Sequence, residues 1–590
     1  MTITTRQSPI RRAKLTAALP LLGFSLLSLY AADSFAVPAN PSKFKIAQPN
    51  GQKIAAINQG DEWNNWVETQ KGYTIAKASD GVWYYVNGFN AVPAAPGLPS
   101  IDAPAQEPVL TGVQAGNPAP SGLAKHLRPA ARTPARSGDT APAGPNQISS
   151  LVSSSNTTGT RNVVFILAEF NNRAGTYAQS TWASFVTNNL GDFYAKASHG
   201  NVTIAPAQET HGAANNGVIG WINVSTQLAA IETSLGKSDT SGNHPNTGGS
   251  TNQYNRLLAK AAMMAADPYI DYSQYDADAN GYVTADELAV VVIVAGYEAS
   301  YDSSTPSVWG HAWRLYSGND GPYPVLDGKT LGVPKSGVGP LGETSGYAEF
   351  GEIQGNHQAT LGIMAHELGH EIFGFADLYD VDNSTISGQT NNGLGSWSLM
   401  SGGSWGAASS QFPGASPVLP DAWSKLQMGW VNPISPRDRI LLTGAGAANA
   451  TPDNTVYKVA TNGAATEYFL IENRQNQGYD RGIQADIPTF SGGLAIYHID
   501  DSISCTDNRC NSHNAHPNHP RVYLRSASRD WILGNTWAQQ ADLWYADGGW
   551  KTVLDSASSP NSNLWSGAAS GVSINSISNS LATMRVRVPQ

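Results

Sequence analysis

The pattern of apolar and polar positions divides the chain into stretches with different expected structures. Strand-like segments at 72–75 and 82–86, separated by a turn signal at 79–81, predict short β-strands within residues 37–98. A largely apolar run at 162–168 predicts a buried strand. Strand-like and helical patterns then alternate to about residue 430, so an α/β domain is expected there.

Two further regions differ in character from this central part. Residues 99–157 are rich in Pro, Ala, Gly and Ser without apolar periodicity, which predicts an exposed linker and processing region. Residues 431–590 contain short alternating segments, at 467–471, 493–499 and 582–588, which predict a β-sandwich domain. The α/β domain is therefore expected to span residues 158–430.

The N-terminus has the pattern of an export signal. Four basic residues come first: Arg6, Arg11, Arg12 and Lys14. An apolar stretch at 15–30, interrupted by Pro20, leads to Ser34-Phe35-Ala36, which fits a small-x-small cleavage site. We therefore expect a signal peptide at 1–36 and a secreted protein without stable membrane association. The small β-rich segment 37–98, placed before a linker, has the position of a propeptide.

Composition narrows the choice of partners and of redox chemistry. The 590 residues exceed what one core can hold, so several domains are expected. A formal net charge of −10 argues against nucleic acid as the main partner. The two cysteines, Cys505 and Cys510, are expected to form a disulfide in an exported protein. A free thiol pair is the alternative, although the spacing is not CxxC.

The clearest chemical motif lies in a predicted helix at 361–373. Its histidines, His366 and His370, are one turn apart and so project from one face, as two ligands of a single Zn²⁺ do. Glu367 lies beside them and can take a proton from a water molecule that zinc activates. The motif therefore predicts a zinc peptidase helix, and a helix that carries two histidines by chance is the alternative.

Two downstream features suggest how the site is completed. Gly374 can end the helix, and Asp377 is then the first carboxylate able to return toward the metal as a third ligand. No glutamate occurs between Ile372 and Thr466, which argues against a glutamate ligand from a later helix. Met400 follows in a Gly- and Ser-rich turn, the pattern of a Met-turn beneath a zinc site, or else of ordinary core filling.

Several segments together resemble the immune inhibitor A family of secreted bacterial metalloproteases. The matching stretches are Gln48–Gly51, Gly60–Trp63, Glu68–Thr69, Trp309–Arg314, His366–Asp380, Trp397–Met400, Ala422–Lys425, Leu426–Trp430, Phe469–Arg474 and Ala495–Asp500. The resemblance implies an α/β zincin-like catalytic domain, a zinc-dependent endopeptidase that cleaves proteins or peptides, and a propeptide that keeps the enzyme latent.

The resemblance also bears on individual residues. The family pattern resembles HExxHxxGxxD, but an extra residue here places Ala376 at the aspartate offset and Asp377 one position later. We expect Asp377 to be the third zinc ligand, with Asp380 as the alternative. His311 and His498 match family positions, and each could line the cleft or be a satisfied structural histidine.

A second metal site is predicted by a twelve-residue loop at 276–287. Its side chains occupy the ligand positions of an EF-hand calcium loop: Asp276, Asp278, Asn280, Tyr282 through its backbone, Thr284 and Glu287. Gly281 permits the sharp turn that such a loop needs. We expect a structural Ca²⁺ there, and an acidic surface turn is the alternative.

A rival function comes from a different class. The chain could be a non-catalytic secreted binding or adhesion protein whose β-rich parts bind glycan or protein. Glu367 argues against this hypothesis, because a binding protein has no need of that carboxylate beside two histidines.

Overall fold

The structure is a computed structural model that describes most of the chain from Phe35 onward. The described residues are 35–36, 38–61, 65–91, 106–129, 157–237, 240–242, 252–315, 320–335, 338–339, 344–379, 385–386, 389–390, 393–435, 438–503, 519–529 and 538–589. Residues 1–34 of the expected signal peptide, Asp380, Cys505 and Cys510 lie outside these ranges. Within them, no helix has both the length and the apolar character needed to cross a bilayer.

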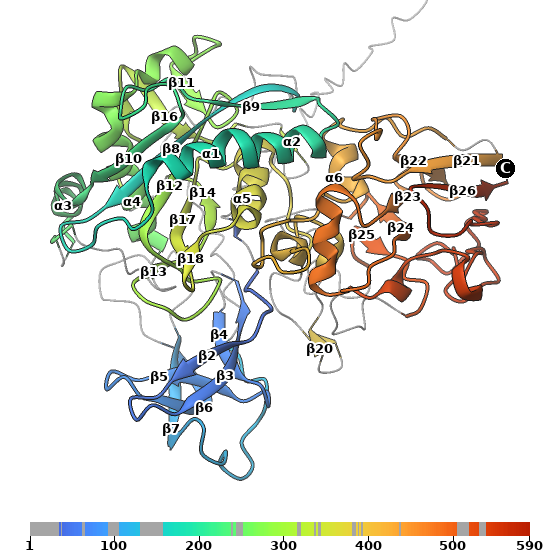
Figure 1. The fold of residues 1–590 in the computed structure, drawn as a ribbon, viewed down its shortest axis with the longest axis horizontal. Helices are drawn as coiled ribbons and strands as arrows, with labels where there is room; N and C mark the ends of the chain where they lie inside the picture. The colour runs from blue at the N-terminus through green and yellow to red at the C-terminus, as the bar shows by residue number, and fades with distance from the viewer. Residues whose placement is uncertain are drawn as a thin grey trace, which may run out of the picture. The chain divides into compact units, whose positions relative to one another are not determined.

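A mixed nine-stranded sheet organises the middle of the chain (Figure 1). Its main path runs β1-β14-β17-β12-β8-β10, with β13, β18 and β9 attached to it. Most neighbours are parallel, but β14 is antiparallel to β17 and β1 is antiparallel to β14. The strands are β1 (Phe35–Ala36), β8 (Gly159–Glu169), β9 (Val202–Pro206), β10 (Val218–Asn223), β12 (Leu288–Glu298), β13 (Ser307–Val308), β14 (His311–Trp313), β17 (Tyr347–Gln354) and β18 (His357–Gln358).

Each face of this sheet is covered by helices, because the central strands are apolar on both sides. In β8, Phe165 belongs to one core cluster and Ile166 to the other, as alternation along a strand requires. One face packs against α1 (Gln179–Ser184), the π-helical turn η2 (Phe185–Leu190), α2 (Gly191–Ala197) and α5 (Leu361–Phe373). The other packs against α3 (Ser225–Ser234) and α4 (Asn252–Ala266). The apolar run at 162–168 is thus confirmed as a buried central strand.

The two ends of this α/β region are joined by hydrogen bonds. Thr157 Oγ1 donates to the carbonyl of Met428 at 2.6 Å, and Trp430 Nε1 donates to the carbonyl of Thr157 at 2.9 Å. All three residues lie just outside regular elements, next to β8 and to α6 (Ala422–Gln427). The chain therefore enters and leaves the region at one place.

The N-terminal module is a separate antiparallel sheet of six strands with its own small core. Its strands are β2 (Phe44–Ala47), β3 (Lys53–Gly60), β4 (Asn65–Thr69), β5 (Thr74–Lys77), β6 (Trp83–Ala91) and β7 (Gln106–Gln114). Strand β7 lies inside the stretch that we expected to be linker, so the expectation for residues 99–157 was wrong over this part. The Pro- and Gly-rich residues on either side of β7 gave no strand signal in the sequence. The strand forms because it pairs with β6, which is rich in aromatic residues.

A few hydrogen bonds connect the N-terminal segment to the α/β region. Asn40 N donates to the carbonyl of Ser300 at 2.8 Å, and Asn58 Nδ2 donates to that of Ala299 at 3.2 Å. Trp405 Nε1 donates to the carbonyl of Pro38 at 2.7 Å. Strand β1, at the expected signal cleavage site, extends the edge of the large sheet beside β14.

The C-terminal region consists of two antiparallel sheets that share one core. Side chains of both sheets, among them Leu442, Phe469, Ile496 and Val586, are buried in the same cluster. The four-stranded sheet is β22 (Val456–Ala460), β23 (Glu467–Arg474), β24 (Gly493–Asp500) and β25 (Val522–Leu524), and the two-stranded sheet is β21 (Asp438–Thr443) and β26 (Thr583–Val588). The expected segments 467–471 and 493–499 fall within β23 and β24, and the third, 582–588, begins one residue before β26.

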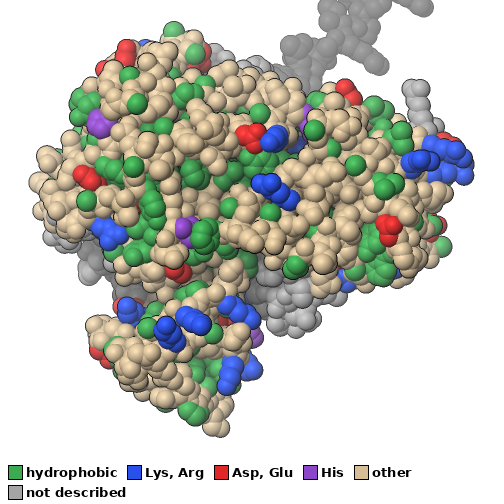
Figure 2. Space-filling model, viewed as in Figure 1, with side chains coloured by type: hydrophobic (Ala, Val, Ile, Leu, Met, Phe, Trp, Pro, Cys, Tyr) green, Lys and Arg blue, Asp and Glu red, His purple; other side chains and the backbone are tan. Residues whose placement is uncertain are grey.

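Smaller elements complete the fold. A three-stranded sheet joins β11 (Tyr282–Thr284), β16 (Lys329–Val333) and β15 (Val325–Leu326), and β19 (Thr385–Ile386) pairs with β20 (Gln389–Thr390). Short 3-10 turns are η3 (Asp267–Tyr269), η4 (Tyr272–Tyr275), η5 (Gly395–Trp397), η6 (Gly402–Trp405), η7 (Gly478–Ala485), η8 (Gln540–Asp542) and η9 (Asp547–Gly549). The face drawn in Figure 2 carries its charged side chains in small, separate groups.

Candidate metal centre and active site

Helix α5 is the element that places the predicted catalytic residues. All thirteen of its residues are buried, because it packs between the large sheet and the loops that follow it. Its apolar side chains, including Leu361, Met364 and Leu368, recur at helical spacing and fill the core on the sheet side. The helix predicted at 361–373 is therefore confirmed over its full length.

The end of α5 turns the chain back on itself, as the sequence indicated. Gly374 has φ of 61° and ψ of 36°, the left-handed conformation that glycine adopts without strain. The turn is closed by Gly374 N donating to the carbonyl of His370 and by Phe375 N donating to that of Gly369, each at 3.1 Å. This geometry brings Asp377 back beneath the helix.

Three side chains converge at this point, and all are buried. Asp377 Oδ1 lies 3.1 Å from His366 Nε2 and 3.2 Å from His370 Nε2, and the two Nε2 atoms are 3.1 Å apart. The structure thus brings together His366, His370 and Asp377, while the alternative Asp380 lies outside the described residues.

The tautomers of the two histidines are fixed by backbone carbonyls. His366 Nδ1 is 2.9 Å from the carbonyl oxygen of Leu399, and His370 Nδ1 is 2.6 Å from that of Phe375. A carbonyl can only accept, so each Nδ1 carries the proton and donates it. Each Nε2 then presents a lone pair to the other and to Asp377 Oδ1.

This donor set fits a small divalent cation. Three acceptor atoms that face one another in a buried site repel unless a positive charge lies between them. Tetrahedral zinc with ligand distances of about 2.0–2.2 Å requires ligand atoms roughly 3.3 Å apart, close to the separations found here. The second ring nitrogen of each histidine is bonded to a carbonyl, as is usual for metal-ligating histidines.

The electrostatics of the group agree with this arrangement. Burial lowers the pKa of His370, and Asp377 only partly opposes that effect. Burial also acts to raise the pKa of Asp377, but His370 and His366, when they carry a proton on Nε2, outweigh it and hold that pKa below its usual range. A carboxylate and a neutral imidazole are the forms in which these groups bind metal.

The loop that contains Met400 supports the group from below. Met400 is fully buried, its carbonyl accepts from Leu378 N at 2.7 Å, and its own N–H donates to Ser398 Oγ at 3.1 Å. The loop therefore holds His366 through the carbonyl of Leu399 and holds the residue next to Asp377 through the carbonyl of Met400.

Comparison with known protein families identifies the region that contains this site. Residues 188–431 match the catalytic domain of the immune inhibitor A peptidase M6 family. This chain carries a peptidase M6 catalytic domain. The match supports a metallopeptidase and confirms the resemblance seen in the sequence. Comparison with curated proteins and with solved structures gave no significant match.

The α/β region that contains the family match begins before residue 188 in the structure. Strand β8 lies before residue 188, yet it occupies the centre of the sheet and pairs with β12, β10 and β9. Together with the mixed α/β sheet and the helices on both faces, this arrangement fits a zincin-like fold.

Glu367 follows His366 on α5, and its side chain is fully buried within the M6 domain. A second glutamate on the same helix, Glu371, is also buried but has a structural partner, since its Oε1 accepts from Val290 N at 2.8 Å. Burial raises the pKa of Glu371 well above its usual range. Glu371 thus serves the packing of α5 on β12.

The two histidines that were expected either at the cleft or in a structural role both lie away from the metal-ligand group. His311 is buried on β14, where its ring contacts Trp313 and Tyr347 in the core on the sheet face opposite α5. His498 lies on β24 of the C-terminal region, stacked between Phe469 and Trp565. The structure does not bring either ring to the metal-ligand group.

The predicted calcium loop is compact and brings its acidic side chains together. Ligand oxygens of Asp276, Asp278 and Glu287 lie within 4.8 Å of one another, and Gly281 has φ of 89°. Lys329 Nζ also lies 2.6 Å from Asp276 Oδ2, so one carboxylate is already paired with an ammonium group. Strand β12 follows the loop directly, where an EF-hand would continue as a helix.

Proposed function

We propose that this protein is a secreted zinc metalloendopeptidase in which His366, His370 and Asp377 hold the metal and Glu367 is the general base. The observation that carries the proposal is the convergence of two imidazole lone pairs and a carboxylate inside an M6 catalytic domain. Protein or peptide chains are the expected substrates. The Gly- and Ser-rich loop of Met400 acts as the Met-turn of this site.

Each residue has a defined part in the proposed hydrolysis. When bound, zinc lowers the pKa of water and polarises a carbonyl group. His366 and His370 keep their protons on Nδ1, where the carbonyls of Leu399 and Phe375 hold them, so both Nε2 atoms stay available. Glu367 accepts a proton from the attacking water and returns it to the leaving amine nitrogen, as a positioned general acid–base group does.

The competing hypothesis of a non-catalytic binding or adhesion protein explains the site less well. A binder gains nothing from burying three mutually repelling acceptor atoms, which cost folding free energy unless a cation compensates them. Glu367, next to His366 in the chain, can supply the proton transfer that hydrolysis needs and that a binding protein does not need.

We further propose a structural Ca²⁺ in the loop at 276–287. Asp276, Asp278 and Glu287 supply three carboxylates within reach of one ion, in the spacing of an EF-hand loop. Their shared position also explains why Lys329 approaches Asp276, since an uncompensated acidic cluster attracts the nearest cation.

The remaining organisation is proposed from the layout of the chain. Residues 1–36 act as a signal peptide, the N-terminal module as a propeptide, Cys505 and Cys510 as a disulfide, and the two C-terminal sheets as a β-sandwich. The contacts from Pro38, Asn40 and Asn58 to the M6 domain support a module that covers the catalytic domain before processing.

The test combines three variants assayed with an unstructured protein substrate and with metal analysis. Glu367→Gln should retain zinc but lower kcat/KM by roughly 10²- to 10⁴-fold, because only the proton acceptor is lost. Asp377→Ala should lower zinc content and activity together. Glu371→Gln is the matched control on the same helix and should leave both unchanged, since its carboxyl group bonds a backbone N–H. Retention of more than about a tenth of wild-type activity in Glu367→Gln would overturn the general-base assignment.

A further inference from the structure

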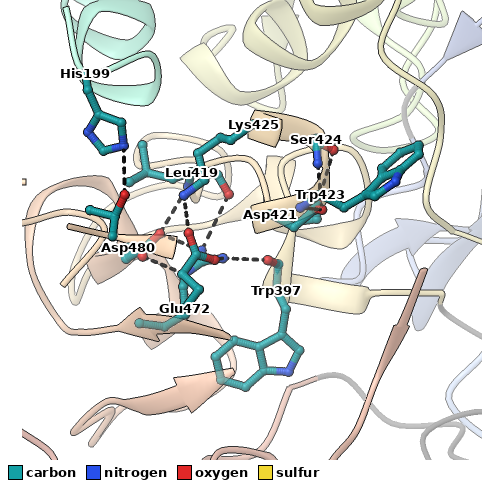
Figure 3. A network of polar contacts seen from close by, with 12 residues as sticks. His199, Trp397, Leu419, Asp421, Trp423, Ser424, Lys425, Glu472 and Asp480 are labelled. Atoms are coloured by element: carbon teal, nitrogen blue, oxygen red, sulfur yellow. Dashed lines mark hydrogen bonds and ion pairs between the residues drawn. The ribbon is translucent and has the colours of Figure 1, made fainter. Parts of the chain in front are cut away.

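Two sequence segments that resembled the family without an evident role meet in the structure. Residues 422–430 form α6 and the turn after it, and residues 469–474 lie on β23 of the C-terminal region. Figure 3 shows the place where they join, with Lys425 from α6 opposite Glu472 from β23. Both side chains are fully buried, as is Arg474 two residues further along β23.

The guanidinium group of Arg474 donates to four partners, the carboxylates of Asp480 and Glu472 and the backbone carbonyls of Trp397 and Leu419. Nε and Nη2 form a two-pronged ion pair with Asp480, at 2.7 Å to Oδ2 and 2.6 Å to Oδ1. Nη1 donates to the carbonyl of Trp397 at 2.8 Å and lies 3.5 Å from Glu472 Oε2. Two acidic and two basic groups are thus balanced in a buried network, and one guanidinium N–H is directed at a backbone carbonyl in the Met400 loop.

That loop is the part of the chain that holds the metal ligands. Trp397 is separated by one residue from Leu399, whose carbonyl accepts from His366 Nδ1. The intervening Ser398 Oγ donates to Asp421 at 2.7 Å and accepts from Met400 N. A displacement of the Trp397 carbonyl would therefore be transmitted to the ring of His366 through two peptide units.

We infer that Arg474, from the C-terminal region, is a positioning residue for the metal ligands of the peptidase domain. The inference rests on the proposed function, because it concerns the same zinc site. Asp480 and Glu472 hold the guanidinium in place. The guanidinium in turn fixes the position of the Trp397 carbonyl, and through the short loop it fixes the Leu399 carbonyl that accepts from His366. Arg474 touches neither the metal ligands nor a substrate, and it acts through the loop alone.

A purely structural role is the alternative, and the chain offers a matched control for it. Arg256 also pairs with a buried aspartate, Asp320, at 3.1 Å, and its Nε donates to the carbonyl of Arg314 at 3.1 Å. This pair lies with α4 on the sheet face opposite α5. Loss of either arginine should destabilise the fold, but only Arg474 is connected to the metal ligands.

The experiment compares Arg474→Met, Arg474→Lys and Arg256→Met in the full chain. Zn²⁺ affinity is measured by competition with a chromophoric chelator, the geometry by the visible spectrum of the Co²⁺-substituted protein, and stability by thermal unfolding of the metal-free protein. We expect Arg474→Met to raise the metal Kd by roughly 10-fold, the lower end of the effect of removing a direct partner of a ligand, because Arg474 acts one step further out, and to change the Co²⁺ spectrum. Arg256→Met should lower the Tm but leave the metal Kd and the spectrum unchanged.

Arg474→Lys separates charge from geometry and remains informative if Arg474→Met fails to fold. Lysine keeps the positive charge beside Asp480 but lacks the planar fork that reaches Trp397 at the same time. It should recover much of the Tm without recovering the metal Kd. If metal affinity instead follows the Tm across all three variants, Arg474 is structural and the inference is wrong.

A further variant distinguishes failure of this inference from failure of the proposed function. His366→Ala should abolish tight metal binding in an otherwise unchanged chain. If the wild-type protein shows no metal binding that depends on His366, the proposed zinc site itself is refuted. If that binding is present and Arg474→Lys matches wild type in Kd and spectrum, only the positioning role is refuted.

Discussion

Replacement of Gly369 by alanine tests how tightly the metal ligands are held. Gly369 precedes His370 on α5, and a Cβ atom there would lie 2.7 Å from Phe375 Cδ2 and 3.2 Å from Met400 Sδ. Both neighbours are fully buried and serve the site, since the Phe375 carbonyl accepts from His370 Nδ1 and the Met400 carbonyl accepts from Leu378 N. The added methyl group therefore presses directly on the elements that orient two ligands.

The expected magnitude follows from two opposing effects. Exchange of glycine for alanine within a helix stabilises it by about 1 kcal/mol. Insertion of a methyl group into a full core costs about 1–3 kcal/mol. Phe375 cannot easily yield, because its N–H bonds Gly369 and its ring packs on Trp430 at 5.5 Å. The cost should lie in the upper part of that range, leaving a net loss of roughly 1–2 kcal/mol.

Gly191→Ala is the matched control. At the start of α2 the new Cβ would meet the carbonyl oxygens of Val186 at 3.5 Å and of Ile204 at 3.9 Å, and both distances are ordinary contacts. The same helix gain without the clash should make this variant neutral or more stable by up to about 1 kcal/mol.

Both glycine variants are made in the Glu367→Gln background to prevent self-cleavage. Urea unfolding of the metal-free protein gives the free energy, and chelator competition gives the metal Kd. We expect Gly369→Ala to lose stability and to bind metal more weakly, with Gly191→Ala unchanged in metal binding. Equal stability of the two variants together with equal metal affinity would refute the view that Phe375 and Met400 rigidly support the ligands.

Three further predictions concern other parts of the molecule. Ca²⁺ at about a hundred times its Kd should stabilise the zinc-loaded wild-type protein by roughly 2.7 kcal/mol but should not stabilise Asp276→Ala. Equal Tm shifts in the two proteins would show that the loop is an acidic turn without a calcium site. Burial, Arg525 and His519 lower the pKa of His498 to about 2. Between pH 6.5 and 2 the folded state therefore binds fewer protons than the unfolded state, so the protein loses stability as the pH falls. Below pH 6.5 the free energy of unfolding should fall with pH in both the wild type and His498→Gln. The slope of the wild type should be steeper by about 1.4 kcal/mol per pH unit, and equal slopes would contradict the low pKa of His498. Cutting the purified precursor between the N-terminal module and residue 157 should raise its activity sharply, whereas an uncut precursor of equal activity would make the module a folding aid or binding domain.

The parts of the site that could be predicted from sequence are those set by local rules. Helical spacing identified α5, and glycine's access to positive φ identified its end at Gly374. Those two features already require the chain to reverse, which is why Asp377 could be named before its position was known. Residues four apart on one helix and a carboxylate just past its end need no knowledge of distant contacts.

The features that escaped sequence reasoning depend on partners far away in the chain. Strand β7 has weak β-propensity in a Pro- and Gly-rich setting, and the neighbouring β6 determines its conformation. Arg474 and Lys425 belong to segments that match the family, but nothing local in the sequence shows that β23 will pack behind the Met400 loop. Whether His311 reaches the site depends on which face of β14 packs against α5. The sequence pattern of a strand of only three residues does not determine that face.

The hydrogen bond from Arg474 to the carbonyl of Trp397 also bears on the timing of synthesis. A ribosome makes α5 and the Met400 loop first, and the residue that completes their support emerges only when β23 has been made. If Arg474 positions the ligands, a nascent chain stopped before β23 holds every catalytic side chain and still lacks a well-ordered metal site. Truncated or incompletely translated copies would then be poor proteases, so a cell that makes this protein would be protected from its own unfinished product.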